Sequence, residues 1–416
     1  MVTNVDRIQE YIEKLSKFNS TPGKGITRLT FTKEDRGARE YIKSEMVKSG
    51  LKVYEDAVGT VVGRLEGEDK FAPVIMVGSH FDSVKNGGKF DGAAGVVMGL
   101  EIARVIRENN IKLKHPIEFV AMIEEEGGRF GRGLFASRAA AGKVTREELY
   151  NSKDESGISI AEAMKEFGLD PEKIYDAKRR PEDIKAFIEL HIEQGPILEK
   201  KDKDIGIVEY IVGLNQIEIV IKGRPDHAGT TPMNMRSDAL DAASNVISKI
   251  SSIAKKVGGG TVATVGTLKV LPGASNIVPG EVIFSVDIRS KDKDCIKKVK
   301  DEICSLLQGI CKEKNVKYTI EEKIYVNPVK MDENIVADFN DICNELGFSS
   351  QPMLSGAGHD AMIMAEITKV GLIFVKSKDG RSHCPEEWTD YKDLQKGIEV
   401  AYKEVLKLGG VISYGN

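Results

Sequence analysis

A strand, a helix and a second strand follow one another between residues 72 and 123, and this succession constrains the fold of the 416-residue chain most strongly. The apolar run Ala72–Gly78 lies between breakers, small residues dominate a helical stretch from about Gly92 to Glu108, and the apolar run Pro116–Ile123 follows. Two continuous apolar strands joined through a helix form a βαβ unit, in which both strands are parallel and buried. We therefore predict an α/β fold with a doubly wound, mainly parallel sheet. The apolar runs at 186–190 and 371–375 are expected to add strands to it.

A different pattern occupies residues 213–327 and predicts an inserted second domain. Its expected elements are a strand at 215–222, a helix at 236–256, strands at 261–270 and 281–289, a helix at 292–313 and a strand at 316–325. This β-α-β-β-α-β order is typical of the ferredoxin-like fold. A chain of this length is expected to form two domains. We therefore predict one domain from residues 1–212 and 328–416, and a second from 213–327.

Charge and hydropathy narrow the range of partners. The chain has 60 Lys and Arg against 64 Asp and Glu, a net charge of -4. It therefore lacks the excess of positive charge that binding to nucleic acid or to a membrane surface would need. No run of about 18 apolar residues occurs, and the first residues lead into an amphipathic helix rather than a signal sequence. We therefore expect a cytoplasmic protein whose partners are small molecules or copies of itself.

Imidazoles and carboxylates gather where the predicted strands of the first domain end. These residues are His80 after the first strand, Asp91 before the helix, Glu125 and Glu126 after the second strand, and His191 and His383 after the later strands. The carboxyl ends of strands in an open α/β sheet meet at one crevice, where ligands bind. Such side chains suit divalent Zn, Mn, Co or Ni. Two alternatives remain at this point: each histidine could be structural, and Glu124–Glu126 could be a solvated acidic turn.

Several segments together resemble a known enzyme family. They are Gly78–Val84, Asn86–Gly92, Glu124–Phe130, Glu189–Gly195, His227–Met233, Ser355–Asp360 and Ser382–Glu387. These segments are similar to those of the hydantoinase/carbamoylase branch of the M20 metallopeptidase-like amidases. That branch includes N-carbamoyl-L-amino acid hydrolases, allantoate amidohydrolases and β-ureidopropionases. The similarity extends over nearly the whole chain, in the order that the family has.

The resemblance implies a catalytic domain that binds two divalent metal ions per subunit. His80, Asp91 and His191 would bind one ion, and Asp91, Glu126 and His383 the other, so that the Asp91 carboxylate bridges them. Asp82 would hydrogen-bond the free ring nitrogen of His80. Glu125 would act as the general base for a metal-bound hydroxide that attacks the ureido carbonyl.

The resemblance also implies roles for residues that bind the substrate. His227, Asn276 and Arg289 of the inserted domain would hold the substrate carboxylate or polarise the scissile group, and Gln194 and His359 would contact the ureido end. The guanidinium of Arg289 suits bidentate carboxylate binding, although its position at a strand end also fits a simple surface charge. The inserted domain is expected to act as a lid and to form a homodimer, with the loop that carries His227 reaching the other subunit's site.

The function implied is hydrolysis of the C–N bond of N-carbamoyl-L-amino acids or related ureido carboxylates. Allantoate amidohydrolase and β-ureidopropionase are the nearest alternatives. An aminoacylase or dipeptidase of the same fold is disfavoured by His191, because those relatives usually have a carboxylate at that ligand position. A two-domain binding protein without catalysis is the alternative of a different class, and the complete set of ligands with Glu125 argues against it.

Overall fold

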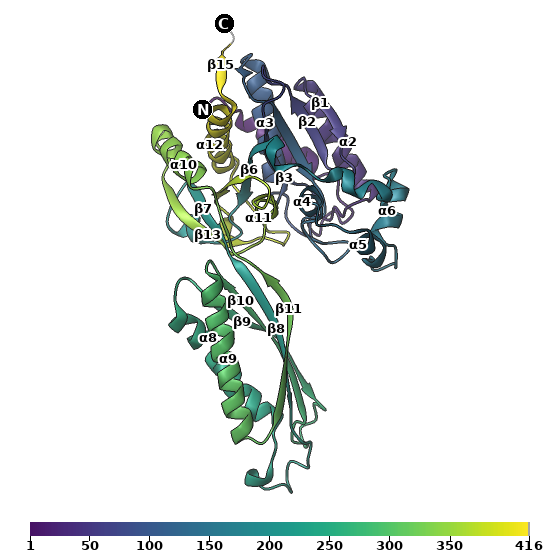
Figure 1. Cartoon of the computed structure of the whole chain (residues 1–416), viewed down its shortest axis with the longest axis vertical. Helices are drawn as coiled ribbons and strands as arrows, with labels where there is room; N and C mark the ends of the chain where they lie inside the picture. Colours follow the sequence, from purple (N-terminus) through teal and green to yellow (C-terminus); the bar gives the residue numbers. More distant parts are fainter. Residues whose placement is uncertain (415–416) are drawn as a thin grey trace. The chain divides into compact units, whose positions relative to one another are not determined.

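The computed structural model describes residues 1–414 and divides the chain into two compact units (Figure 1). The first unit contains Met1–Glu209, Met331–Met353 and His359 to the end of the described chain. The second contains Tyr210–Lys330 and Leu354–Gly358. The second unit begins three residues before and ends three residues after the expected range 213–327, and it also includes Leu354–Gly358, which we expected in the first domain. Residues 415 and 416 of the expected first domain lie outside the described residues.

The first unit is built on a mixed sheet whose central strands are parallel. Its strands run in the order β1-β2-β5-β3-β6-β14-β7, with β13 also paired to β7. The bounds are β1 Lys52–Glu55, β2 Val61–Leu65, β3 Val74–His80, β5 Ile117–Met122, β6 Ile184–Ile192, β7 Ile205–Ile211, β13 Ser350–Ser355 and β14 Lys369–Val375. Strand β3 pairs in parallel with β5 and β6, and β6 pairs in parallel with β14. Every residue of β3 and β5 is buried, as their continuous apolar runs predict.

Helices cover both faces of this sheet, which confirms the doubly wound fold. Gly397 of α12 (Tyr391–Gly409) packs against the side chain of Leu190 in β6, whereas the neighbouring Glu189 accepts a hydrogen bond from the amide of Ala361 in α11 (Asp360–Met364). Successive strand residues point to opposite faces. Helices α12 and α11 therefore lie on opposite sides of β6. Helix α3 (Ala93–Glu108) packs against β3, β5 and α12.

The remaining elements of the first unit surround this core. The helices are α1 Val5–Leu15, α2 Lys33–Lys48, α4 Phe135–Ala140, α5 Arg146–Asn151, α6 Ile160–Phe167, α7 Ile197–Lys200 and α10 Glu333–Leu346, and the short strands β4 Lys112–Leu113 and β15 Val411–Ser413 pair with each other. Helix α2 begins directly after Thr32, because the hydroxyl of Thr32 accepts the amide of Asp35 at 3.3 Å and caps the helix there. Among residues 1–414, no helix is both long and apolar enough to cross a membrane.

The second unit has the expected ferredoxin-like order. It contains β8 Gly213–Lys222, α8 Ala239–Val257, β9 Val262–Leu271, β10 Glu281–Ser290, α9 Lys293–Glu313 and β11 Lys317–Val326, and the two-residue β12 Val329–Lys330 pairs with Tyr210 and Ile211. The four long strands form an antiparallel sheet in the order β11-β8-β10-β9. Burial alternates along β8 and β10, because only one sheet face packs against α8 and α9.

Candidate metal centre

The five predicted ligands lie together in the first unit. His80 is the last residue of β3, His191 is the penultimate residue of β6, and Asp91 lies just before α3. Glu126 follows β5, and His383 follows β14. Because the central strands are parallel, their carboxyl ends bring these side chains to one edge of the sheet.

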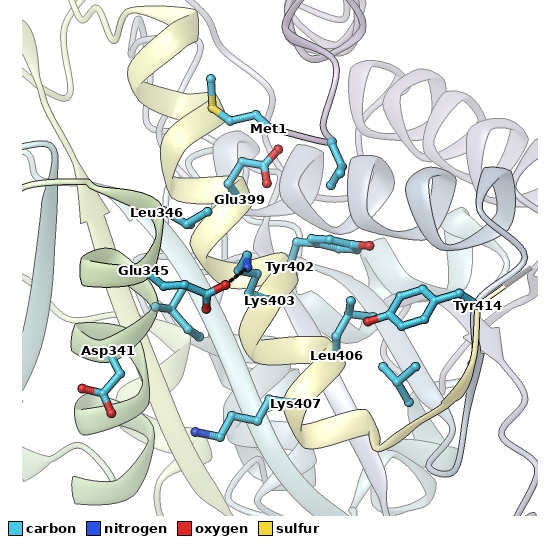
Figure 2. Close-up of a pocket in the computed structure, with 13 residues that line it drawn as sticks. Met1, Asp341, Glu345, Leu346, Glu399, Tyr402, Lys403, Leu406, Lys407 and Tyr414 are labelled. Atoms are coloured by element: carbon cyan, nitrogen blue, oxygen red, sulfur yellow. Dashed lines mark hydrogen bonds and ion pairs between the residues drawn. The ribbon is translucent and has the colours of Figure 1, made fainter.

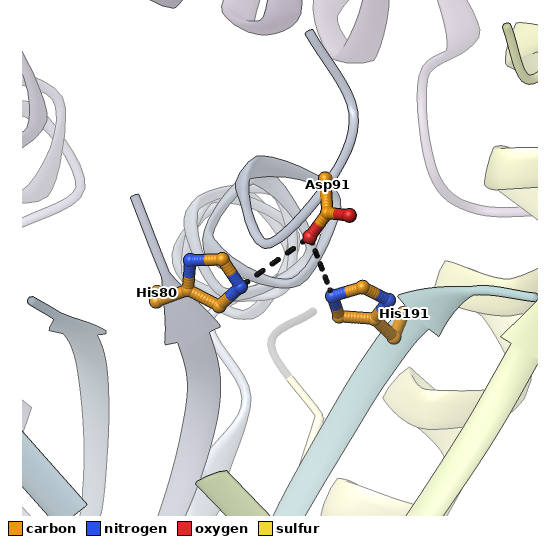
Figure 3. A group of neighbouring side chains, drawn as sticks. All are labelled: His80, Asp91 and His191. Atoms are coloured by element: carbon orange, nitrogen blue, oxygen red, sulfur yellow. Dashed lines mark ion pairs between the residues drawn. The ribbon is translucent and has the colours of Figure 1, made fainter. Parts of the chain in front are cut away.

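The first triad consists of His80, Asp91 and His191. Figure 3 shows the Asp91 carboxylate between the two imidazole rings. Its Oδ1 lies 3.5 Å from Nε2 of His80 and 3.1 Å from Nε2 of His191. All three residues are buried. Their ligand atoms lie within 4.8 Å of one another, which suits a single bound cation.

The second triad shares Asp91 with the first. The other oxygen, Oδ2, lies 3.4 Å from Nε2 of His383, and Oε1 of Glu126 lies 3.3 Å from the same nitrogen. These three ligand atoms also lie within 4.8 Å of one another. Each oxygen of Asp91 therefore faces a different triad, which is the arrangement a bridging carboxylate needs.

A buried turn holds Glu125 and Glu126 at this cluster. The backbone amides of Glu125 and Glu126 donate to Oδ1 and Oδ2 of Asp82 at 3.1 and 3.2 Å. Nδ1 of His80 lies 3.4 Å from Oδ1 of Asp82 and 3.2 Å from its main-chain oxygen. Asp82 thus contacts His80 as the resemblance implies, and it also orients the acidic turn, a role that the sequence did not suggest.

Burial excludes the alternative of a solvated acidic turn. Glu124 is 1% exposed, and the side chains of Glu125 and Glu126 are 10% and 8% exposed. Oε2 of Glu125 lies 3.6 Å from Nε2 of His80. Glu125 is therefore placed beside the first triad, within reach of a group bound there.

The electrostatics of the cluster favour added positive charge. Burial raises the pKa of Glu125 well above its usual range; His80 opposes this and Glu126 adds to it. Burial also works to raise the pKa of Asp91, but the charge of His191 and hydrogen bonds from the histidines lower it well below its usual range. Hydrogen bonds to Asp91 and Glu126 raise the pKa of His383 to about 11. A group of carboxylates that stabilises charge on its histidines in this way would also stabilise cations.

The donor set and the packing fit a pair of divalent ions. Within residues 1–414, Nε2 of His80 is buried and makes no hydrogen bond. Gly92 lies against the His80 ring at a φ of 62°, so any side chain at this position would overlap the imidazole. Imidazole and carboxylate ligands suit Zn and related metals. The chain therefore offers two triads that share Asp91, and the ligand atoms of His80, Glu125 and Glu126 form a third group within the same 4.8 Å limit.

Two predicted substrate contacts lie beside the triads. Nε2 of Gln194 donates to Oδ2 of Asp91 at 2.7 Å, and the Gln194 backbone has a positive φ of 56°. The buried His359 ring lies 4.5 Å from the His191 ring and 5.5 Å from the Phe374 ring, measured between centroids. Both residues are thus neighbours of the candidate ligands.

The other predicted substrate contacts belong to the second unit. The exposed His227 pairs with Ile277, and the carbonyl of Asn276 accepts the amide of Ala228 at 2.9 Å. His227 and Asn276 therefore lie on adjoining segments. Arg289, at the end of β10, donates to Asp287 at 2.8 and 3.2 Å and to the carbonyl of Gly356 at 2.5 Å. These contacts hold the guanidinium in place. A simple surface charge, the alternative for Arg289, would not need such contacts.

Two further residues of the site were missed from the sequence. The buried Glu387 accepts the amides of Phe90 and Asp91, and the hydroxyl of Ser382 lies 2.8 Å from both Asp91 and Glu387. Both belong to the Ser382–Glu387 segment that carries His383. Their place in this segment was the only sign in the sequence that they belong to the site, because Phe90 and Asp91, which they contact, are nearly 300 residues away.

A cavity elsewhere in the first unit has no comparable chemistry. It measures about 690 Å³ and lies beside α10 and α12, with Glu345, Tyr402, Lys403 and Tyr414 among its lining residues (Figure 2). No predicted site residue lines it. This cavity is therefore separate from the two triads.

Comparisons with known proteins find relatives over nearly the whole chain. The chain matches the model of the peptidase family M20/M25/M40 over residues 76–407. It is 46% identical over 398 residues to an N-carbamoyl-L-amino-acid amidohydrolase of Paenarthrobacter aurescens, covering 96% of each chain. It is 37% identical over 401 residues to an allantoate amidohydrolase of Bacillus subtilis, covering 96% of this chain and 97% of that one. A solved amidase of the hydantoinase/carbamoylase family from Burkholderia multivorans matches with a TM-score of 0.91 and 33% identity, covering 98% of both chains.

Proposed function

The chain belongs to peptidase family M20/M25/M40, and on that premise we propose that it is a metal-dependent amidohydrolase of N-carbamoyl-L-amino acids. Membership of the family confirms the resemblance drawn from the sequence. The similarity to carbamoyl-amino-acid and allantoate amidohydrolases over nearly the whole chain supports a ureido amide as the scissile group. The single observation that carries the metal assignment is the placement of the two Asp91 oxygens, one toward each triad.

We propose that His80, Asp91 and His191 hold one divalent ion, and that Asp91, Glu126 and His383 hold the other. Zn, Mn, Co and Ni all suit this ligand set. Bound there, the ions would act as Lewis acids on water and on the scissile carbonyl. The contacts of Asp82 with the turn fix the backbone of both Glu125 and Glu126.

Glu125 is proposed as the general base and acid of the reaction. Its carboxylate takes a proton from the attacking water and later gives that proton to the leaving nitrogen of the amino acid. The water oxygen forms a bond to the ureido carbon, and the bond from that carbon to the amino nitrogen breaks. The products are the free amino acid and carbamate, which decomposes to carbon dioxide and ammonia.

His227 and Asn276 adjoin the end of β10 opposite to Arg289, so they are proposed to contact the substrate in the site of a second chain. The substrate carboxylate is proposed to bind Arg289. The hydrogen bonds of Arg289 to Asp287 and Gly356 support this proposal, because they restrict the guanidinium before a ligand arrives. Gln194 and His359 are proposed to contact the ureido end, since both adjoin the triads.

Replacing Arg289 by Lys should lower kcat/KM for an N-carbamoyl amino acid by at least about tenfold, because an ammonium cannot make the bidentate contact. A matched substrate whose carboxylate is replaced by a neutral amide should be poor for the wild type and nearly insensitive to the substitution. Steady-state kinetics on both substrates measures the two effects. Equal kcat/KM of wild type and Arg289→Ala on the carboxylate substrate would remove Arg289 from the carboxylate site.

A substrate panel tests the proposed activity against its alternatives. Ammonia release should be fastest from N-carbamoyl-L-amino acids, and slower from allantoate and N-carbamoyl-β-alanine. Amine release from N-acetyl amino acids and dipeptides should be minor, since an imidazole, His191, completes the first triad. A preference for allantoate would move the proposal to its nearest alternative, and a preference for dipeptides would reject a ureido substrate.

We also propose that the protein forms a homodimer with composite active sites. The loop after His227 exposes two large apolar side chains, Met233 at 78% and Met235 at 64%, which supports a contact with another chain. Mixing inactive His227→Ala with inactive Glu125→Gln should then restore some activity, because a hybrid dimer contains one intact site. If labelled subunits exchange and no activity returns, His227 does not act in the partner's site.

A further inference from the structure

We propose that Glu387 is a positioning residue that assembles the second metal triad, acting through Ser382 and through the backbone of Asp91. This inference rests on the proposed metal pair, and it assigns to Glu387 the role of joining two ligands that are distant in the sequence. One carboxylate contacts both the segment that carries Asp91 and the segment that carries His383.

Glu387 uses both of its oxygens for this contact. Oε1 accepts the amides of Phe90 and Asp91 at 2.9 and 3.0 Å, and Oε2 lies 2.8 Å from the hydroxyl of Ser382. The same hydroxyl lies 2.8 Å from Oδ2 of Asp91. The Glu387 carboxylate therefore restrains the backbone of Asp91 directly and its side chain through one intervening hydroxyl.

Packing around Glu387 makes this link rigid. Glu387 is 3% exposed, and its carboxyl lies so close to Gly88 that a side chain at residue 88 would overlap it. The next residue, Trp388, packs edge-on against Phe90 with ring centroids 5.5 Å apart, and the ammonium of Lys89 lies 4.5 Å from the Trp388 ring centroid. Residues 88–90 are thus held against residues 387–388 by contacts other than the carboxylate itself, so a substitution of the carboxylate should leave the segment in place.

The contact between Ser382 and Asp91 involves only one of the two triads. Ser382 approaches Oδ2 of Asp91, the oxygen that faces His383, whereas Oδ1 faces His80 and His191. Ser382 is also the residue immediately before His383. Loss of the Glu387 carboxylate should therefore disturb the second triad and leave the first triad largely intact. Groups that orient metal ligands in this way typically contribute 10- to 100-fold to metal affinity.

The test is a calorimetric titration of metal-stripped protein with Mn²⁺, and metal analysis then gives the number of ions bound per chain. Wild type should bind two ions per chain. Glu387→Met keeps the length of the side chain but removes both the acceptor for the backbone amides and the partner of the Ser382 hydroxyl; it should bind one ion normally and the other about 10- to 100-fold more weakly. Ser382→Ala should show the same selective loss, and its smaller change protects the test if Glu387→Met does not fold.

Glu399→Met is the matched control. Glu399 is also a buried glutamate of the first unit, and its Oε1 lies 2.7 Å from the Thr3 amide and 2.8 Å from the Thr3 hydroxyl. This variant should bind both ions as wild type does, even if its melting temperature falls. Two ions bound with unchanged affinity in folded Glu387→Met or Ser382→Ala would overturn the inference. Wild type that binds fewer than two ions would instead contradict the proposed metal pair.

Discussion

Asp91→Ala should abolish hydrolysis and deprive the protein of both metal ions. Asp91 is the only residue common to the two triads among the described residues, and each of its oxygens faces a different set of ligands. His80→Ala should also abolish activity, but it removes a ligand of the first triad alone. Metal analysis after dialysis and ammonia release measure the two consequences separately.

Asp170→Ala provides the control for Asp91→Ala. Asp170 also lies directly before a helical segment, and its carboxylate accepts the amide of Glu172 at 3.0 Å. It lies outside the metal centre, so this variant should keep its metal and its turnover. Full metal content in folded Asp91→Ala would show that Asp91 is not the shared ligand.

Glu125→Gln should preserve metal content yet lower kcat by about 10² to 10⁴, the range typical of general acid-base catalysis. Glu125 lies 3.6 Å from His80, but it is outside the two triads that share Asp91. The amide of glutamine keeps the shape of the side chain and cannot accept the proton. Turnover measured at saturating substrate, together with metal analysis, reports the expected separation.

The neighbouring Glu126→Gln supplies the comparison for Glu125→Gln. Glu126 lies 3.3 Å from His383 in the second triad, so this substitution should weaken metal binding. Restoring activity with excess metal is expected for Glu126→Gln and not for Glu125→Gln. If the two variants exchanged these properties, the assignments of base and ligand would have to be reversed.

The fold could be predicted because the two sheets have different hydrophobic patterns. Continuous apolar runs at β3 and β5 indicate strands buried on both faces, and the alternating pattern of β8 and β10 indicates a sheet covered on one face. Because the carboxyl ends of parallel strands meet at one edge, this pattern also predicts that His80, His191 and His383 lie near one another. The period of the hydrophobic pattern and the succession of elements along the chain are properties of the sequence itself, so a single sequence can reveal them.

Other features depend on contacts that a local pattern does not contain. The two hydrogen bonds that Asp82 accepts from the turn span more than 40 residues, and those between Glu387 and Phe90 or Asp91 span nearly 300. Such residues are recognised only when folding has brought the distant segments together.

Metal-dependent hydrolysis of a ureido amide is tested most directly by returning metal to stripped enzyme while ammonia release from an N-carbamoyl-L-amino acid is measured. Activity should be absent without metal, should rise as Mn²⁺ or Zn²⁺ is added, and should reach its maximum at two bound ions per chain. The same titration of Asp91→Ala should give no activity at any metal concentration. Full turnover by enzyme without detectable metal, or no ammonia release at full occupancy, would contradict the account.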